Sequence, residues 1–173
     1  EQVDVAEEKS RNEWLSWIQG KNIPIHVFVY TAGIVSADGK GKFLHKYPYE
    51  EIFKIFTVNT LAMIHMTEEF KNSFFIPQKE GRIITVASLA GIIRDVGAGI
   101  YDASKAAVIS YMRTLGKEID GLNKIKQCDI KSNCIAPGMV ASAMTVHLNK
   151  QETEAEKQLR KSQLDRFGQN DFS

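Results

Sequence analysis

Two runs of the chain are apolar at nearly every position, and a segment long enough for a helix separates them. The runs are residues 25–30 and 82–87. A strand with one wet face alternates apolar and polar residues, whereas a strand covered on both faces reads as a continuous apolar run. A third run, residues 130–136, stops at Pro137 and Gly138. The first two runs favour strands that are covered on both faces of a sheet, and the third is a further strand candidate.

Helical periodicity fills the segments around these runs. Trp14, Trp17 and Ile18 fall at helical spacing, and similar apolar stripes cover residues 52–70 and 108–119. We interpret these stripes as packing faces rather than cofactor contacts. The alternation predicts an α/β fold, a partial Rossmann-like doubly wound parallel sheet with helices on both faces. The carboxyl ends of its strands would share one edge, where such folds bind ligands.

A length of 173 residues predicts a single domain, which we expect to be incomplete. Residues 3–5 resemble the tail of a strand, and residues 166–171 resemble a loop that enters a helix. Hydrophobic residues make up 43% of the chain and charged residues 25%, which excludes a disordered or fibrous protein.

Charge and hydropathy exclude further classes of protein. There are 22 basic and 21 acidic residues, and no basic run marks a nucleic-acid surface. The longest apolar stretch, residues 23–35, is too short to span a bilayer, and no targeting segment is visible. The spacing of Cys128 and Cys134 fits neither a zinc ligand pair nor a disulfide framework. We therefore expect a cytoplasmic protein with reduced thiols and without a nucleic-acid or membrane partner.

Tyr101 and Lys105 lie four residues apart at the start of a helical stripe, and so share one helix face. An ordinary Tyr pKa of about 10 is too high for proton exchange at neutral pH, and a nearby ammonium lowers that pKa. Such a Tyr can act as general acid or base. Ser88 ends the second strand, where its hydroxyl could bond a substrate oxygen. The alternative is a surface pair and a helix-capping serine, but a strand-end Ser combined with the pair favours catalysis.

Ordered motifs along nearly the whole chain resemble those of the short-chain dehydrogenases/reductases. The stretch from Tyr101 to Lys105 resembles the start of the family's catalytic helix, and residues 83–88 resemble its catalytic-serine strand. Asn59 lies where the family places a helix Asn. The other matching segments are Thr31-Ala32-Gly33, Asn133 to Val140 with Ser142, Asp4-Val5, and Arg166 to Gln169. Among family members the chain looks most like the 3-oxoacyl-acyl-carrier-protein reductases.

The resemblance implies an oxidoreductase that interconverts a small-molecule carbonyl and a secondary alcohol with NAD or NADP. Tyr101 would exchange the proton, Lys105 would lower the Tyr pKa and contact the nicotinamide ribose, and Ser88 would polarise the carbonyl. Asn59 would hold a water of a proton relay. Family members pair two long helices, which implies a homodimer or homotetramer. Besides Tyr101 and Lys105, the residues implied to line the cofactor are Asp4, Val5, Ala32, Gly33, Pro137, Gly138, Val140 and Ser142.

The sequence also departs from the family. It has no glycine-rich turn that could cradle the cofactor's pyrophosphate, and the glycine doublets at residues 39–41 and 97–99 follow no strand. The segment that selects NAD or NADP and the family's last strand are absent too. Tyr30 replaces the first Asn of the turn after the first strand. Polar insertions at residues 36–41 and 122–128 are interpreted as solvated loops.

Other chemistry has little support in the sequence. The four histidines share no helical spacing and have no acidic partner nearby in sequence, so we expect no metal site. Ser88 lacks the flanking glycines of a hydrolase elbow. The charged residues 150–166 are expected to form a helix over the cleft. The remaining rival is a truncated, inactive family member that serves as an interaction or structural module. The missing phosphate turn favours that rival, and the intact catalytic set favours the enzyme.

Overall fold

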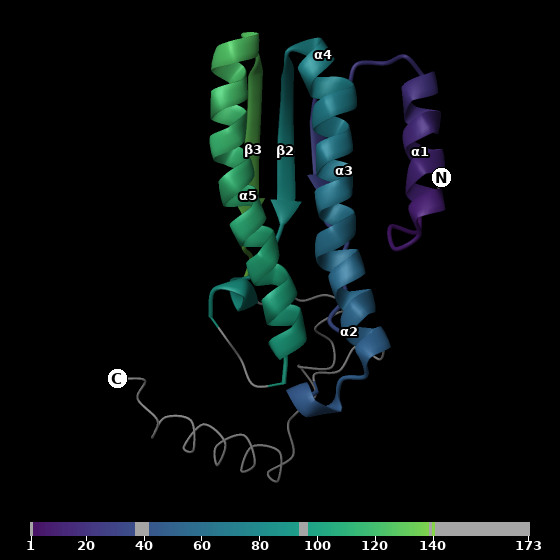
Figure 1. Ribbon diagram of the computed structural model, residues 1–173, viewed down its shortest axis with the longest axis vertical. Helices are drawn as coiled ribbons and strands as arrows, with labels where there is room; N and C mark the ends of the chain where they lie inside the picture. The colour runs from purple at the N-terminus through teal and green to yellow at the C-terminus, as the bar shows by residue number, and fades with distance from the viewer. Residues whose placement is uncertain (1, 37–41, 94–96, 139, 141–173) are drawn as a thin grey trace. The chain divides into compact units, whose positions relative to one another are not determined.

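The computed structural model describes residues 2–36, 42–93, 97–138 and 140 (Figure 1). Residues Glu1–Gly138 form one compact unit, and Met139–Ser173 form a second. The second unit lies almost entirely outside the described residues, and so does the helix predicted over residues 150–166. The single domain predicted over residues 1–173 therefore stays a prediction.

Three parallel strands form the sheet in the order β1-β2-β3. They are β1 (Val27–Tyr30), β2 (Glu80–Val86) and β3 (Asp129–Ile135). Phe28 lies opposite Ile83, and Ile83 lies opposite Ser132. The predicted parallel sheet and its three strands are confirmed. Because the strands run in one direction, their carboxyl ends meet at the lower edge of the sheet in Figure 1.

Three helical stretches connect or precede these strands. The first is α1 (Glu8–Gly20), and the last is α5 (Gly99–Lys126). The middle stretch is unbroken and contains two π-helical turns, and its parts are α2 (Tyr49–Phe56), η2 (Thr57–Leu61), α3 (Ala62–Phe70), η3 (Lys71–Phe75) and α4 (Ile76–Gln78). Two short 3₁₀ turns, η1 (Leu44–Lys46) and η4 (Leu89–Gly91), lie in the connections. The predicted helices are therefore confirmed, but the predicted packing faces are wrong at two positions, because Trp17 is 44% and Phe53 is 56% exposed.

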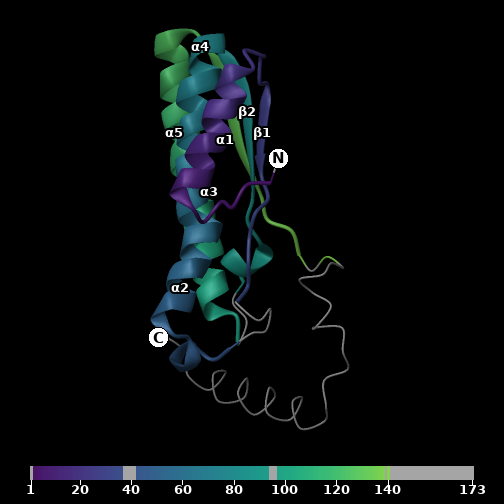
Figure 2. The same cartoon turned by 90° about the vertical axis from the view of Figure 1, so that its right-hand side faces the viewer.

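The helices of the described residues gather on one face of the sheet (Figure 2). Phe28 and Ile83 point toward these helices and are 7% and 0% exposed. Val27 and Val29, which alternate with Phe28, are each 50% exposed. The expected cover by helices is thus found on one face of the described part. The sequences of β1 and β2 predicted strands covered on both faces, because most of the residues on their outward side are apolar as well.

An aromatic cluster joins α1, α3 and β1. The ring of Phe70 stacks on Phe28 with 4.0 Å between the centroids, and Trp14 and Phe74 lie 5.8 and 5.1 Å from the same ring. Burying a side chain of this size stabilises the fold by about 1.5–3 kcal/mol. Phe70 therefore anchors α3 on the sheet and α1 on α3.

Three side-chain amides pair with backbone at or next to the strands. Each amide oxygen accepts from the N–H of one residue, and each amide nitrogen donates to the carbonyl of the same residue, as a neighbouring strand would. This pairing satisfies backbone groups that would otherwise be buried without a partner. The pairs are Gln78 with Ile25, Asn59 with Ile34, and Asn123 with Ile130, at 2.6 to 3.1 Å.

The prediction of a loop at residues 122–128 is wrong for most of that segment. Helix α5 continues to Lys126 and ends at Gln127, whose φ of 54° is left-handed. Leu122 packs against the core, and Asn123 binds Ile130, so both side chains extend the helix beyond its apolar stripe. Of the other insertion, residues 37–41 lie outside the described residues.

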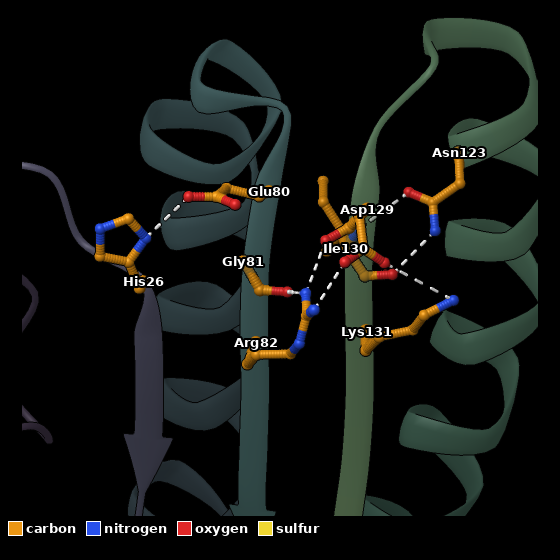
Figure 3. A network of polar contacts seen from close by, with 8 residues as sticks. All are labelled: His26, Glu80, Gly81, Arg82, Asn123, Asp129, Ile130 and Lys131. Carbon is orange, nitrogen blue, oxygen red and sulfur yellow. Dashed lines mark hydrogen bonds and ion pairs between the residues drawn. The ribbon is translucent and has the colours of Figure 1, made fainter.

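Charged side chains line the amino ends of the strands (Figure 3). Arg82 Nη2 lies 2.6 Å from Asp129 Oδ2, and His26 Nδ1 lies 3.0 Å from Glu80 Oε1. The hydrogen bond from Arg82 holds the pKa of Asp129 below its usual range. These side chains are roughly half exposed, so the ion pairs add little stability.

Gly81→Ala should destabilise the fold, because the new Cβ would lie 2.1 Å from the Phe75 ring, which is 0% exposed. Overpacking of this kind costs about 1–3 kcal/mol or more. Gly121→Ala is the matched control, since its Cβ would meet no atom within 4 Å and should stabilise α5 by about 0.5–1 kcal/mol. Urea unfolding measures both, and equal stability of the two variants would contradict the packing described.

Candidate active site

Ser88 lies directly beyond the carboxyl end of β2. Its Oγ accepts the Ala90 N–H at 3.1 Å and so caps η4. The ladder between β2 and β3 continues on both sides of it, since Ala87 and Leu89 donate to the carbonyls of Ile135 and Pro137 at 2.8 Å. The capping role that was the alternative interpretation is therefore present, and the role of Ser88 toward a substrate oxygen stays a prediction.

Tyr101 lies in the first turn of α5. Burial raises its pKa, the polar side chain of Ser88 lowers it, and the Asp102 carboxylate raises it further. The net direction is upward, whereas the sequence predicted a lowering by Lys105. The physical reason is position, because Lys105 Nζ lies 5.7 Å from the centroid of the Tyr101 ring and is directed to a backbone carbonyl.

Lys105 is 3% exposed, and its Nζ donates to the Val86 carbonyl at 2.9 Å. Burial lowers the pKa of this ammonium. The side chain also lies against the turn after β1, because a Cβ on Gly33 would come within 3.2 Å of Lys105 Nζ. Lys105 therefore joins α5 to the ends of two strands.

Asn59 lies in the π-helical turn η2 and is 1% exposed. Its Oδ1 accepts the Ile34 N–H at 2.8 Å, and its Nδ2 donates to the Ile34 carbonyl and to Ser104 Oγ, both at 2.9 Å. Ser104 Oγ in turn donates to the Tyr101 carbonyl at 2.7 Å. Both amide hydrogens of Asn59 are thus used within the protein, and its role in a water relay stays a prediction.

The sequence did not single out Ser104 as a site residue, and it marked Tyr30 as a departure from the family motif. Ser104 is 0% exposed and links Asn59 to the backbone of Tyr101, and its only signal was its place between Tyr101 and Lys105. Tyr30, which stands in place of an expected Asn, donates from its hydroxyl to the Val58 carbonyl at 2.6 Å. Burial raises the pKa of Tyr30, so the hydroxyl remains a donor at neutral pH.

Some of the residues predicted to line a cofactor lie together at one edge of the sheet, and the others do not. Ala32 and Gly33 follow β1, and Pro137 and Gly138 follow β3, so these four share the edge that holds Ser88. Val140 is 59% exposed, and Ser142 lies outside the described residues.

Asp4 and Val5 do not form the tail of a strand. Asp4 Oδ1 accepts the Ala6 N–H at 2.9 Å in a turn before α1, and the Val5 carbonyl accepts from Arg11 Nη1 at 2.6 Å. The charge of Arg11 also acts on Tyr30, at the end of β1.

Among residues 2–36, 42–93, 97–138 and 140, no group of three or more His, Cys, Asp or Glu side chains could hold a metal ion. No helix in that part of the chain is long and apolar enough to cross a membrane.

The profile of the short chain dehydrogenases matches residues 1–153. The chain therefore belongs to the short-chain dehydrogenase/reductase family, a family of NAD(P)-dependent oxidoreductases. This confirms the family that the motifs indicated.

Curated relatives agree with this assignment. Nodulation protein G of Rhizobium meliloti (strain 1021) is 38% identical over 131 residues, which are 75% of this chain and 49% of that protein. The 3-oxoacyl-acyl-carrier-protein reductase of Synechocystis is 29% identical over 168 residues, which are 97% of this chain and 62% of that protein. The chain spans about half of the length of the curated relatives that it matches.

Solved structures confirm the fold. A short chain dehydrogenase/reductase from Burkholderia phymatum in complex with NAD has a TM-score of 0.73 and 22% identity, over 95% of this chain and 58% of that one. Serine dehydrogenase from Escherichia coli has a TM-score of 0.70 and 24% identity, over 81% of this chain and 60% of that one.

Lys105→Met should alter how stability depends on pH. The pKa of Lys105 is lowered in the folded protein, so below its ordinary value of 10.5 the unfolded state binds more protons than the folded state. The free energy of unfolding of the wild type should therefore gain on that of Lys105→Met as pH rises toward 10.5. Urea unfolding across this range measures the difference. Lys124→Met, which removes an exposed lysine of the same helix, is the control, and parallel curves for wild type and Lys105→Met would contradict the burial of the charge.

Proposed function

We propose that this chain carries the catalytic part of an enzyme that interconverts a carbonyl and a secondary alcohol with NAD(H) or NADP(H). The observation that carries the proposal is the buried ammonium of Lys105, which lies 5.7 Å from the centroid of the Tyr101 ring and is bound to the Val86 carbonyl, two residues before Ser88. Two hydroxyls and a cation thus meet at the carboxyl edge of a parallel sheet, where folds of this kind bind ligands.

Each of these residues has a distinct proposed role. Tyr101 gives its proton to the developing alkoxide when a ketone is reduced and takes it back in the reverse direction. Ser88 donates a hydrogen bond that orients the carbonyl oxygen. Lys105, held by the Val86 carbonyl, stabilises negative charge as it forms.

The described residues fit the nicotinamide half of the cofactor. Gly33 lies close to Lys105 Nζ, since a Cβ there would come within 3.2 Å of it, and Ala32, Pro137 and Gly138 lie on the same edge. These residues would hold the nicotinamide and its ribose with Lys105. NAD or NADP, when bound, supplies or accepts the hydride.

A second candidate, a non-catalytic interaction module, is favoured by the outward side of β1. Val27 and Val29 are half exposed there, and within the described sheet β1 has a neighbour on one side only. The predicted homodimer or homotetramer and the cytoplasmic location stay predictions.

The chain by itself should bind NADH and NADPH weakly, because its sequence contains no glycine-rich turn for the pyrophosphate. Fluorescence of Trp14 and Trp17 during titration with each cofactor measures the affinity. An enzyme that joins this chain to a family phosphate turn is the positive control. Micromolar affinity of the chain alone would show that its own residues suffice.

Tyr101→Phe in such a joined enzyme should lower kcat by at least about 10²-fold, because it removes the proton donor and keeps the ring. The loss should fall on kcat rather than KM, since the proton moves only in the transition state. Tyr111→Phe is the matched control, because it removes a hydroxyl of the same helix that binds Glu68 at 2.7 Å. Steady-state kinetics decide between the candidates, and a Tyr101→Phe enzyme with a tenth of the wild-type rate would favour the module.

A further inference from the structure

Tyr30 joins the end of β1 to the middle helical stretch. Its side chain is 5% exposed, and its hydroxyl donates to the Val58 carbonyl at 2.6 Å. Burial raises the pKa of this phenol, so the hydroxyl keeps the proton that it donates. Because the family motif has an Asn at this position, the contact comes from a residue in which this chain departs from the motif.

The carbonyl that accepts this hydrogen bond lies in the π-helical turn η2. In that turn the N–H of Ala62 bonds to the Thr57 carbonyl, five residues earlier rather than four. Single π turns interrupt the regular ladder of a helix, and they are frequent at functional sites. A peptide unit is planar, so the bond from Tyr30 to the Val58 carbonyl also fixes the plane of the amide that leads into Asn59.

Asn59 and Thr60, the next two residues of η2, bind other elements. Asn59 pairs with both backbone groups of Ile34, at 2.8 and 2.9 Å. Its Nδ2 also donates to Ser104 Oγ at 2.9 Å, and Thr60 Oγ1 donates to the Ser104 carbonyl at 3.0 Å. These three side chains, of Asn59, Thr60 and Ser104, are at most 5% exposed. Ser104 directly precedes Lys105, so η2 holds α5 at the residue next to the buried ammonium.

We propose that Tyr30 is a positioning residue for the proposed reaction, which acts through η2 on the part of α5 that carries Tyr101 and Lys105. The inference rests on the proposed function and adds a residue that gives no group to the reacting atoms. Without the hydroxyl, the Val58 carbonyl loses a buried donor, and the peptide before Asn59 is free to rotate. A small displacement of reacting groups lowers the rate of the chemical step more than the binding of substrate.

Tyr30→Phe tests the contact directly, because it removes the hydroxyl and keeps the ring. Amide hydrogen exchange, followed by NMR on the chain itself, measures the Ile34 N–H, which Asn59 Oδ1 accepts at 2.8 Å. Exchange at Ile34 should become about threefold to tenfold faster in the variant. The internal reference is the Ile130 N–H, which Asn123 Oδ1 accepts at 3.1 Å near the start of β3. A loss of global stability would speed exchange at both amides, whereas loss of the contact to η2 should speed exchange at Ile34 alone.

The second measurement uses the joined enzyme. Tyr30→Phe should lower kcat about tenfold and change KM by less than about twofold. The substrate is the ketone that the wild type reduces fastest in a panel of cyclic, aliphatic and aryl ketones. Tyr111→Phe is the matched control, because it also removes the hydroxyl of a ring that packs against the core, one that donates to Glu68 at 2.7 Å. This control should keep the wild-type kcat.

Unchanged exchange at Ile34 in Tyr30→Phe, or a kcat equal to that of Tyr111→Phe, would overturn the positioning role and leave the oxidoreductase in place. A rise in KM without a loss of kcat would overturn it as well, because Tyr30 would then act in binding. If the wild-type joined enzyme reduces no ketone of the panel, the proposed function fails. The positioning role then fails with it, whatever the exchange at Ile34 shows.

Discussion

The hydrogen bond from the buried ammonium of Lys105 to the Val86 carbonyl fixes how α5 lies against the ends of the strands. An unpaired charge in a protein interior is costly, and here the Val86 carbonyl, 2.9 Å away, is the partner. To reach it, α5 must approach the carboxyl ends of the strands more closely than side chains usually allow. Glycine makes this approach possible, because a Cβ on Gly91 would touch the backbone of α5 and a Cβ on Gly33 would crowd Lys105 Nζ. The position of Tyr101, one turn earlier, follows from this contact.

A chain of hydrogen bonds then joins the helices to the strand ends. It runs from the backbone of Ile34 through the amide of Asn59 and the hydroxyl of Ser104 to the Tyr101 carbonyl. Tyr30 adds a second link from the end of β1 to the Val58 carbonyl in the π-helical turn. The turn after β1, the middle helix and α5 are therefore held as one assembly, and the proposed site needs this to keep its reacting groups aligned.

The electrostatics around Tyr101 differ from what the sequence predicted. Burial raises the pKa of Tyr101, which makes the phenol a weaker acid than an ordinary Tyr, so the proposed proton transfer needs a lowering of this pKa that the described residues alone do not supply.

The sequence by itself determined the strands, the apolar helix faces and the family, because periodicity and local motifs are written in neighbouring residues. It also indicated that Ser88, Tyr101 and Lys105 act together. Tertiary structure decided the rest. The direction of the Tyr101 pKa depends on burial and on where Lys105 Nζ points, and the role of Ser104 depends on a helix that lies 45 residues earlier in the chain. The same holds for the exposed outward side of β1, since an apolar strand reads the same in sequence whether one face or both are covered.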